Sequence, residues 1–485
     1  MSLYFVMLMI VAHYTSKNKS NDTFFTGNKN NNWLLIAFGM IGSSLSGVTF
    51  LSIPGTVEKN SMFYMQIAFG YILGYLIIAF VLLPIYYRYN LTSIYTYLKH
   101  RFGPITYKTG SFYFLISRLL GSSVRLYLVA NIFQIFLFKQ YNLPFWVSVL
   151  ISIVLIWLYT NKGGIKTIIY TDALQTTFML ASLVIAIVLI LNNLDLSFGE
   201  LWQKGLEKGY TKMFQTDNFL AGNYWIKGIL GGMFITIAMT GVDQDMMQKN
   251  LSCKNLKDAQ KNMVSFSIVL VFINLMFLIL GVCLFVFINE NAALKEIWMQ
   301  DGGKTDALFA TIALKGGLGS FFGIVFLLGL IAAAYSSADS ALTALTTSFC
   351  IDFIDIEKKP ENMQKKYRQY THIGMSFLTF ICVLIFNELN NKAVIDALFK
   401  IAGYTYGPLL GLFFFGILSK RKINDKYPVF ITIAIMFLVY FIDNIVLSNP
   451  NGFKFGFELL GLNAILTMLC LHLFSSKECS ISKTV

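Results

Sequence analysis

Charged residues are scarce in this sequence, and their scarcity argues against a soluble protein. Only 13% of the 485 residues are Asp, Glu, Lys or Arg, against roughly 25% in soluble domains. The six cysteines show no paired spacing, so they predict neither a disulfide framework nor a metal site. The four histidines lie at predicted helix ends, which argues against a histidine proton relay. No metal cluster, nucleophile triad or cofactor motif occurs at the spacing that a membrane enzyme would need.

Long hydrophobic runs are what the sequence has in excess. Charge-free runs such as 62–87 and 263–288 exceed the roughly 20 residues that a helix needs to cross about 30 Å of hydrocarbon. We therefore predict an all-α membrane protein, residues 1–485, forming a single polytopic domain with about thirteen transmembrane helices. These spans begin near Leu3, Trp33, Met62, Ser111, Leu143, Ile165, Trp225, Val264, Gly319, His372, Ala393, Pro428 and Phe455.

The first predicted span is short. Residues 2–14 cover about 20 Å at about 1.5 Å per residue, so either the helix is tilted in a thinned bilayer or the true start lies upstream. We expect 1–15 to form a peripheral helix and not a removable signal peptide, because no basic leader or small-residue cleavage site is present. The connections 192–224 and 289–318 contain amphipathic stretches, predicted to be either interfacial helices or solvated connectors.

The formal net charge of +13 follows the predicted topology and does not indicate a nucleic-acid partner. Most Lys and Arg fall in alternate connections, among them KHRFGPITYK, KNLSCKNLKDAQK (249–261), EKKPENMQKKYR and KRKINDK. Positive residues mark the cytoplasmic side. We therefore expect a multi-pass inner (plasma) membrane protein with its N-terminus outside and its C-terminus in the cytoplasm. The lipid bilayer and a small solute are the expected partners, and no obligate protein partner is inferred.

A carboxylate and many hydroxyls interrupt the apolar segment 319–349, whose middle reads AAAYSSADSALTALTT. Small and hydroxyl residues recur every three or four positions there and share one helix face. Such a face either packs closely against another helix or supplies oxygen ligands to a monovalent cation. Asp339 favours the second reading, because a charge at membrane depth usually faces a cavity, a partner or an ion.

Two predicted spans carry glycine- and serine-rich interruptions. They read GMIGSSLSGVTF (39–50) and GILGGMFITIAMTGVDQD (228–245), and they stand five spans apart. Interrupted helices at membrane depth expose backbone carbonyls that can bind cations. The spacing is typical of five helices repeated in inverted orientation.

Four stretches resemble the sodium:solute symporter family, which includes glucose, proline and sialic acid cotransporters. They are GSSLSGVTFLSIPG (42–55), GGIKTIIYTDALQ (163–175), GVDQDMMQKNLSCKNLKDAQ (241–260) and the helix 332–347. The resemblance implies a LeuT-type 5+5 inverted repeat with discontinuous first helices. Residues 33–191 would form the first repeat, 225–418 the second, and 428–475 two C-terminal helices.

The resemblance also implies a sodium site between the first broken helix and the helix 319–349. Its ligands would be the carbonyls of Gly42, Leu45 and Ala333 and the hydroxyls of Ser336 and Ser337. Glycine at position 42 departs from the family's usual alanine, which a carbonyl ligand tolerates. Sodium is the only ion or cofactor expected, with no organic cofactor.

Sialic acid cotransporters of the family have a second sodium site, and the resemblance assigns it here to Asp172, Asp339 and Ser340. Asp339 replaces a neutral hydroxyl ligand, so two carboxylates could converge on one cation. The alternative is that one of these carboxylates pairs with Arg118 or Arg125 across helices.

The solute would contact side chains that flank the first interruption. We expect Ser44, Ser46, Thr49, Gln66, Arg118 and Arg125 to line this site. The two arginines share a helix face, and three roles are open for them. They contact an anionic solute, they neutralise acidic residues, or Arg118 extends its charged end to the membrane surface. Met239 and Thr240 stand where some relatives place an aromatic gate, which argues against sugar stacking.

The function expected from these features is Na+-coupled symport of a small polar solute by alternating access. A sugar or sugar acid such as sialic acid is the leading substrate. The alternatives are a proton-coupled symporter of an organic acid and a transporter-like sensor. The chain ends soon after its last predicted span, which disfavours a sensor with an added signalling domain.

Overall fold

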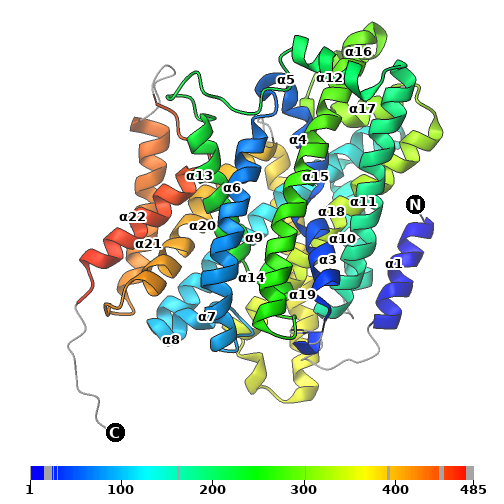
Figure 1. Cartoon of the computed structure of the whole chain (residues 1–485). Helices are drawn as coiled ribbons and strands as arrows, with labels where there is room; N and C mark the ends of the chain where they lie inside the picture. The colour runs from blue at the N-terminus through cyan, green and yellow to red at the C-terminus, as the bar shows by residue number, and fades with distance from the viewer. Residues whose placement is uncertain are drawn as a thin grey trace.

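The computed structural model is a bundle of α-helices (Figure 1). It describes residues 2–15, 25, 27–29, 31–160, 164–300, 302–389, 394–446 and 453–476. Within these ranges the only strand-like pairings are two isolated bridges, Asn31 with Cys253 and Lys422 with Ser476. The prediction of an all-α protein is confirmed for this part of the chain.

The helices follow one another with short connections. In chain order they are α1 (Ser2–Thr15), α3 (Trp33–Ser44), α4 (Gly47–Gly55), α5 (Val57–Asn60), α6 (Tyr64–Ile77), α7 (Leu83–Arg88), α8 (Thr96–Arg101), α9 (Pro104–Phe133), α10 (Phe145–Thr160), α11 (Gly164–Leu194), α12 (Phe198–Glu207), α13 (Trp225–Thr236), α14 (Gln244–Asn250), α15 (Leu256–Glu290), α16 (Ala292–Gln300), α17 (Leu308–Lys315), α18 (Ser320–Ser348), α19 (Glu361–Leu389), α20 (Val394–Leu418), α21 (Tyr427–Phe441) and α22 (Leu459–Leu473). Five π-helical segments continue some of them, at Ile78–Leu82, Gln134–Phe138, Ile237–Gly241, Phe349–Phe353 and Ile442–Val446.

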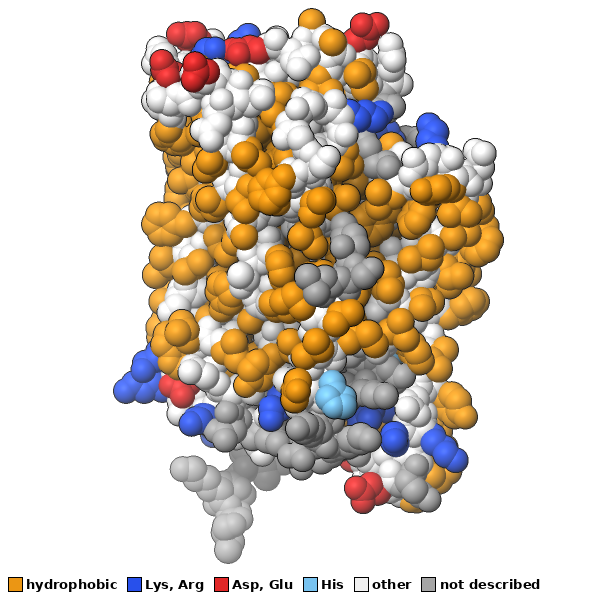
Figure 2. Space-filling model, turned by 90° about the vertical axis from the view of Figure 1, so that its right-hand side faces the viewer, with side chains coloured by type: hydrophobic (Ala, Val, Ile, Leu, Met, Phe, Trp, Pro, Cys, Tyr) orange, Lys and Arg blue, Asp and Glu red, His pale blue; other side chains and the backbone are white. Residues whose placement is uncertain are grey.

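The apolar helices match the predicted spans in position. In the described part of the chain eight helices are long and apolar enough to cross a membrane, or ten if each of two bent pairs is one span. Three shorter apolar helices, Tyr4–Thr15, Phe145–Thr160 and Leu459–Leu473, lie at three further predicted positions. The count of thirteen spans is therefore not confirmed. Figure 2 shows a hydrophobic band across one face of the molecule, with charged side chains gathered at its two ends.

The first bent pair consists of α3 and α4, which meet at 57°. Leu45 and Ser46 between them have extended backbone conformations, so the helical hydrogen bonding stops there. Among the described residues no hydrogen bond reaches the carbonyl oxygens of Gly42 and Leu45. This break leaves acceptors that a cation could use.

The second bent pair consists of α13, with its π-helical continuation, and α14, and the two axes meet at 69°. Here Asp243 caps α14, since its side chain accepts a hydrogen bond from the Asp245 N–H at 2.9 Å. The carbonyls at this break accept hydrogen bonds from tyrosine hydroxyls: Tyr86 to Gly241 at 2.7 Å and Tyr95 to Val242 at 3.0 Å. Backbone freed by the bend is thus satisfied by side chains.

Small residues bring each broken helix close to its neighbours. A Cβ added at Gly39 in α3 would lie 3.1 Å from the Ile169 carbonyl of α11, and one at Gly70 in α6 would lie 2.1 Å from the Ile229 carbonyl of α13. Helices can approach this closely only where the side chains are small. Figure 1 shows the two broken helices inside the bundle, with α5, α12, α16 and α17 together at one end.

Candidate solute and cation sites

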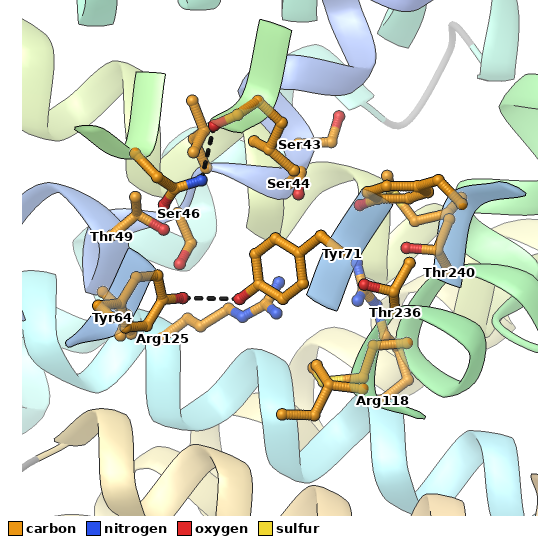
Figure 3. Close-up of a pocket in the computed structure, with 18 residues that line it drawn as sticks. Ser43, Ser44, Ser46, Thr49, Tyr64, Tyr71, Arg118, Arg125, Thr236 and Thr240 are labelled. Atoms are coloured by element: carbon orange, nitrogen blue, oxygen red, sulfur yellow. Dashed lines mark hydrogen bonds between the residues drawn. The ribbon is translucent and has the colours of Figure 1, made fainter. Parts of the chain in front are cut away.

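A central cavity of about 80 Å³ lies between the two broken spans (Figure 3). Hydroxyl groups from the first break, aromatic rings of α6, arginines of α9 and residues of the second break line it. The lining residues are Ser43, Ser44, Leu45, Ser46, Val48, Thr49, Tyr64, Tyr71, Tyr75, Arg118, Arg125, Ile235, Thr236, Met239, Thr240, Met246, Leu270 and Asn274.

Five of the six predicted solute contacts line this cavity: Ser44, Ser46, Thr49, Arg118 and Arg125. Gln66 is not among the residues that line this cavity. Its amide nitrogen donates to the Asn223 carbonyl at 3.2 Å, and its amide oxygen accepts from the Gln215 N–H at 2.8 Å. The amide binds the irregular segment 215–223 because that backbone has no helical partners of its own.

Arg118 is neutralised by the second break. Its guanidinium hydrogen-bonds the Asp245 carboxylate and lies 3.7 Å from Asp243 Oδ2, while all three side chains are almost fully buried. The Tyr406 hydroxyl donates to the same Asp243 oxygen at 2.6 Å. Of the roles predicted for Arg118, neutralising acidic residues is the one seen here. Asp243 and Asp245, at the start of α14, were not singled out as site residues in the sequence.

Arg125 lies seven residues after Arg118, on the same face of α9, and has no carboxylate partner among the described residues. Among the described residues no carboxylate lies within ion-pair distance of it, and its buried Nε makes no hydrogen bond. Figure 3 shows its guanidinium pointing into the cavity. A half-buried cation that lines a cavity without a protein counter-charge favours an anionic occupant.

The aromatic part of the cavity was not anticipated from the sequence. Tyr64, Tyr71 and Tyr75 of α6 line it, and the hydroxyls of Tyr64 and Tyr71 are hydrogen-bonded at 2.8 Å. Their spacing of seven and four residues places them on one helix face, so the sequence did carry the signal. They supply hydroxyls and ring surface opposite the serines of the first break.

The predicted first cation site requires the first break to lie against α18, and it does. A Cβ added at Gly42 would lie 3.2 Å from Ser336 Oγ, and one at Gly47 would lie 4.0 Å from the Ala334 Cβ. Ser336 and Ser337 are buried and do not face lipid. An alanine at position 42 would place its Cβ 2.3 Å from Thr176 Oγ1 of α11. Glycine at this position therefore leaves the space that the Thr176 side chain occupies.

Asp172 is the centre of a dense polar cluster. Its Oδ1 accepts from the Ser336 hydroxyl at 2.6 Å, and its Oδ2 accepts from the Ser43 hydroxyl at 2.8 Å. The Lys249 ammonium also lies 2.8 Å from Oδ2. The cluster joins α3, α11, α14 and α18.

Lys249 was expected in a cytoplasmic connection, within the stretch 249–261, and this expectation is wrong. The residue belongs to α14, and its side chain is only 1% exposed. Its Nζ donates to Ser340 Oγ at 2.7 Å as well as to Asp172 and Ser43. The sharp bend before α14 turns this short helix inward, which charge counting along the chain does not detect.

Asp339 is buried beside this cluster. Its Oδ2 accepts from the Tyr159 hydroxyl at 2.9 Å, and its Oδ1 accepts from the Ser340 hydroxyl at 3.2 Å. Among the described residues neither Asp172 nor Asp339 forms an ion pair with an arginine. The predicted alternative of an arginine partner is therefore not what the structure shows: the basic partner of Asp172 is Lys249.

A helical membrane bundle with two broken helices around a polar central cavity defines a secondary transporter. The model of the sodium:solute symporter family matches residues 24–426, and the chain belongs to that family. It is therefore a Na+-coupled transporter in a membrane and not an enzyme.

Individual relatives are distant but cover most of the chain. The sodium/sialic acid symporter SiaT of Proteus mirabilis (strain HI4320) is 23% identical over 444 residues, 89% of this chain and 86% of that protein. The sodium/sialic acid symporter NanT of Aliivibrio fischeri is 24% identical over 423 residues, 86% and 81% respectively. A solved structure of a Na+-coupled sialic acid symporter in a substrate-bound, outward-open state has a TM-score of 0.83 at 20% identity and covers 98% of each chain. This likeness confirms the predicted fold class.

Proposed function

We propose that the solute is a small organic anion and that a sugar acid such as sialic acid is the leading candidate. The observation that carries this proposal is the Arg125 guanidinium, which lines the cavity without a carboxylate partner among the described residues. A guanidinium binds a carboxylate with two parallel hydrogen bonds. The hydroxyls of Ser44, Ser46 and Thr49 could then bind the hydroxyl groups of a sugar acid. The sialic acid specificity of the two named bacterial relatives supports the same class.

We infer that sodium binds between the first break and α18. The proposed ligands are the carbonyls of Gly42, Leu45 and Ala333 and the hydroxyls of Ser336 and Ser337. Two observations support them: the acceptors of Gly42 and Leu45 are free of hydrogen bonds from described residues, and Gly42 packs against Ser336. Binding there would order the break and so prepare the adjoining solute site. Sodium and solute would then cross together by alternating access.

The remaining sequence predictions fit this scheme as proposals. Residues 33–191 and 225–418 are proposed as the inverted repeats, supported by bent pairs of 57° and 69° near the start of each. The N-terminus is proposed to lie outside the cell and the C-terminus inside. On the face drawn in Figure 2, Lys and Arg occur at both ends of the molecule and are more frequent at the lower end. By the positive-inside rule the lower end would be the cytoplasmic one.

The test is uptake by proteoliposomes containing the purified full chain. Labelled N-acetylneuraminic acid and a neutral hexose are offered separately under an imposed sodium gradient. We expect sodium-dependent uptake of the acid, and loss of at least 100-fold in uptake by Arg125→Gln. Uptake that follows a pH gradient without sodium would favour the proton-coupled alternative. Uptake of the hexose unaffected by Arg125→Gln would overturn the anion proposal.

A further inference from the structure

The buried ammonium group of Lys249 occupies a position made of cation ligands. Its Nζ lies 2.8 Å from Asp172 Oδ2 and 2.7 Å from Ser340 Oγ, and it also donates to Ser43 Oγ. Asp172 and Ser340 are two of the three residues that the family resemblance assigns to a second sodium site. The same oxygen atoms that could bind sodium are bound to a side chain of this protein.

The hydrogen bonds around this ammonium group are complete. A lysine ammonium has three donors and no acceptor, and the three acceptors come from α3, α11 and α18. Each serine hydroxyl still has its own proton to donate: Ser43 to Asp172 at 2.8 Å, and Ser340 to Asp339 at 3.2 Å. The contacts therefore fit a charged lysine, since every donor meets one acceptor.

The charges around Lys249 show why a cation is needed there. Asp172 and Asp339 are both fully buried, and buried carboxylates must be paired with a positive charge or take up a proton. Asp245 Oδ1 lies 3.7 Å from Lys249 Nζ, but this carboxylate is already paired with Arg118. Lys249 thus compensates Asp172 without any ion from solution.

We propose that Lys249 acts as a built-in cation at the second cation position, so that this transporter couples one sodium ion to each solute. The inference rests on the proposed function. The ammonium group also joins the two broken spans, because Ser43 directly precedes the first break and Lys249 follows the second. A positive charge at this point favours the same arrangement of α3, α14 and α18 in every transport cycle, whatever the sodium concentration.

The proposal predicts how Lys249→Gln changes ion binding. Removing the ammonium frees Asp172 and Ser340, and a sodium ion takes its place. Sodium binding to the purified protein, measured without solute, should rise from one ion per chain to two. Lys249→Arg keeps the charge and should stay at one ion. Lys227→Gln is the matched control, because it removes another buried lysine, one that lies over the Phe453 ring at 3.6 Å. Its Nζ donates to the carbonyls of Leu220, Ala221 and Lys454.

Transport gives an independent measure of the same change. One sodium ion carried with a monovalent anion moves no net charge, whereas two sodium ions move one. An inside-negative potential of 100 mV is worth about 2.3 kcal/mol for one charge, which is about 50-fold in accumulation. Steady accumulation of N-acetylneuraminic acid should therefore respond to the potential about 50-fold more in Lys249→Gln than in the unmodified protein. With a neutral solute, each protein would move one more positive charge per cycle. The 50-fold difference between the two proteins would stay the same.

A second variant keeps the proposal falsifiable if Lys249→Gln does not fold. The double variant Asp172→Asn, Lys249→Gln removes both charges of the pair, and we expect it to bind one sodium ion. Two sodium ions bound by the unmodified protein, or one bound by a folded Lys249→Gln, would overturn the proposal. Failure to transport any acid would overturn the proposed function alone, because the count of bound sodium needs no solute.

Discussion

The two broken helices differ in what meets their exposed backbone. At the α3–α4 break, the carbonyls of Gly42 and Leu45 receive no hydrogen bond from the described residues. At the α13–α14 break, the carbonyls of Gly241 and Val242 accept hydrogen bonds from Tyr86 and Tyr95. The sequence patterns are alike, with glycine and small polar residues in both. Of these four carbonyls, the two at the first break stay open to a mobile ion in the described part of the chain.

The two breaks also differ in the charged side chains that they carry. The residues of the first break are themselves neutral, so this segment offers a cation uncharged oxygen ligands. The charges nearest to it, Asp172 and Lys249, belong to other helices and contact Ser43. The second break carries Asp243, Asp245 and Lys249, and Arg118 reaches it from α9. A fixed set of charges stabilises one geometry, whereas neutral ligands can be ordered by the ion that binds. We infer that the first break is the ion-responsive one and the second is a brace. Four experiments test this difference.

Breaking the brace should have the largest effect. Arg118→Gln leaves Asp243 and Asp245 buried without their arginine, which typically costs about 3–5 kcal/mol. We expect a matching loss in the free energy of unfolding, measured by denaturation of the purified protein in detergent. Arg118→Lys should lose less, because it keeps the charge and forfeits only the two-pronged geometry. Equal stability of Arg118→Gln and the unmodified protein would show that the ion pairs do not brace the second break.

Crowding the breaks should affect the first more than the second. A Cβ at Gly47 would lie 2.6 Å from Val129 Cγ2, and the branched valine has little freedom to turn away. Gly47→Ala should therefore cost about 1–3 kcal/mol of stability. A Cβ at Gly241 would meet the Leu82 Cδ1 atom at 2.5 Å, the end of a flexible side chain, and the Ile78 Cγ1 atom at the longer distance of 2.9 Å. Gly241→Ala should cost less in the same unfolding assay, and the reverse order would contradict the packing argument.

Removing a ligand at the first break should weaken sodium binding. Ser337→Ala deletes one proposed hydroxyl ligand, and we expect about tenfold lower sodium affinity, or about 1.4 kcal/mol. Sodium titration of the purified protein measures this directly. Ser152→Ala is the control, since this buried serine donates to the Ser148 carbonyl of its own helix, at 2.9 Å. An equal loss of affinity in both variants would indicate a general effect of hydroxyl removal and not a ligand role.

Freeing a carbonyl at the second break should have the smallest effect. Tyr95→Phe removes the hydrogen bond to Val242, at a cost of about 1 kcal/mol in stability. Sodium affinity should stay within about twofold, because these carbonyls are not proposed as ligands. A tenfold loss of sodium affinity in Tyr95→Phe would place sodium at the second break as well and would remove the distinction between the two.

Much of the candidate site could be found by reading along the chain. The breaks were visible as glycine and serine runs within apolar spans, and Asp172, Asp339 and the serines of α18 stood out as polar groups at membrane depth. Their burial is confirmed. These features are local, since a residue that interrupts an apolar run does so whatever it packs against.

Other parts of the site could not be found in this way. Lys249 contacts Asp172, which is 77 positions earlier, and Arg118 pairs with Asp245, which is 127 positions later. In the sequence Lys249 stands at the head of a basic stretch, so counting charges assigns it to a connection. The position of Gln66 outside the cavity could not be found for the same reason: its amide binds the segment 215–223, which is about 150 positions away.

The sequence by itself determined that this is a helical membrane transporter with two interrupted helices, because hydrophobic length and local helix breakers are properties of neighbouring residues. The tertiary structure decided which carbonyls stay open, which arginine is neutralised and which cation meets Asp172. Those outcomes depend on the directions in which helices distant in the chain turn their polar side chains. In a bilayer interior each such group must find a partner, and only the packed bundle shows which partner it has.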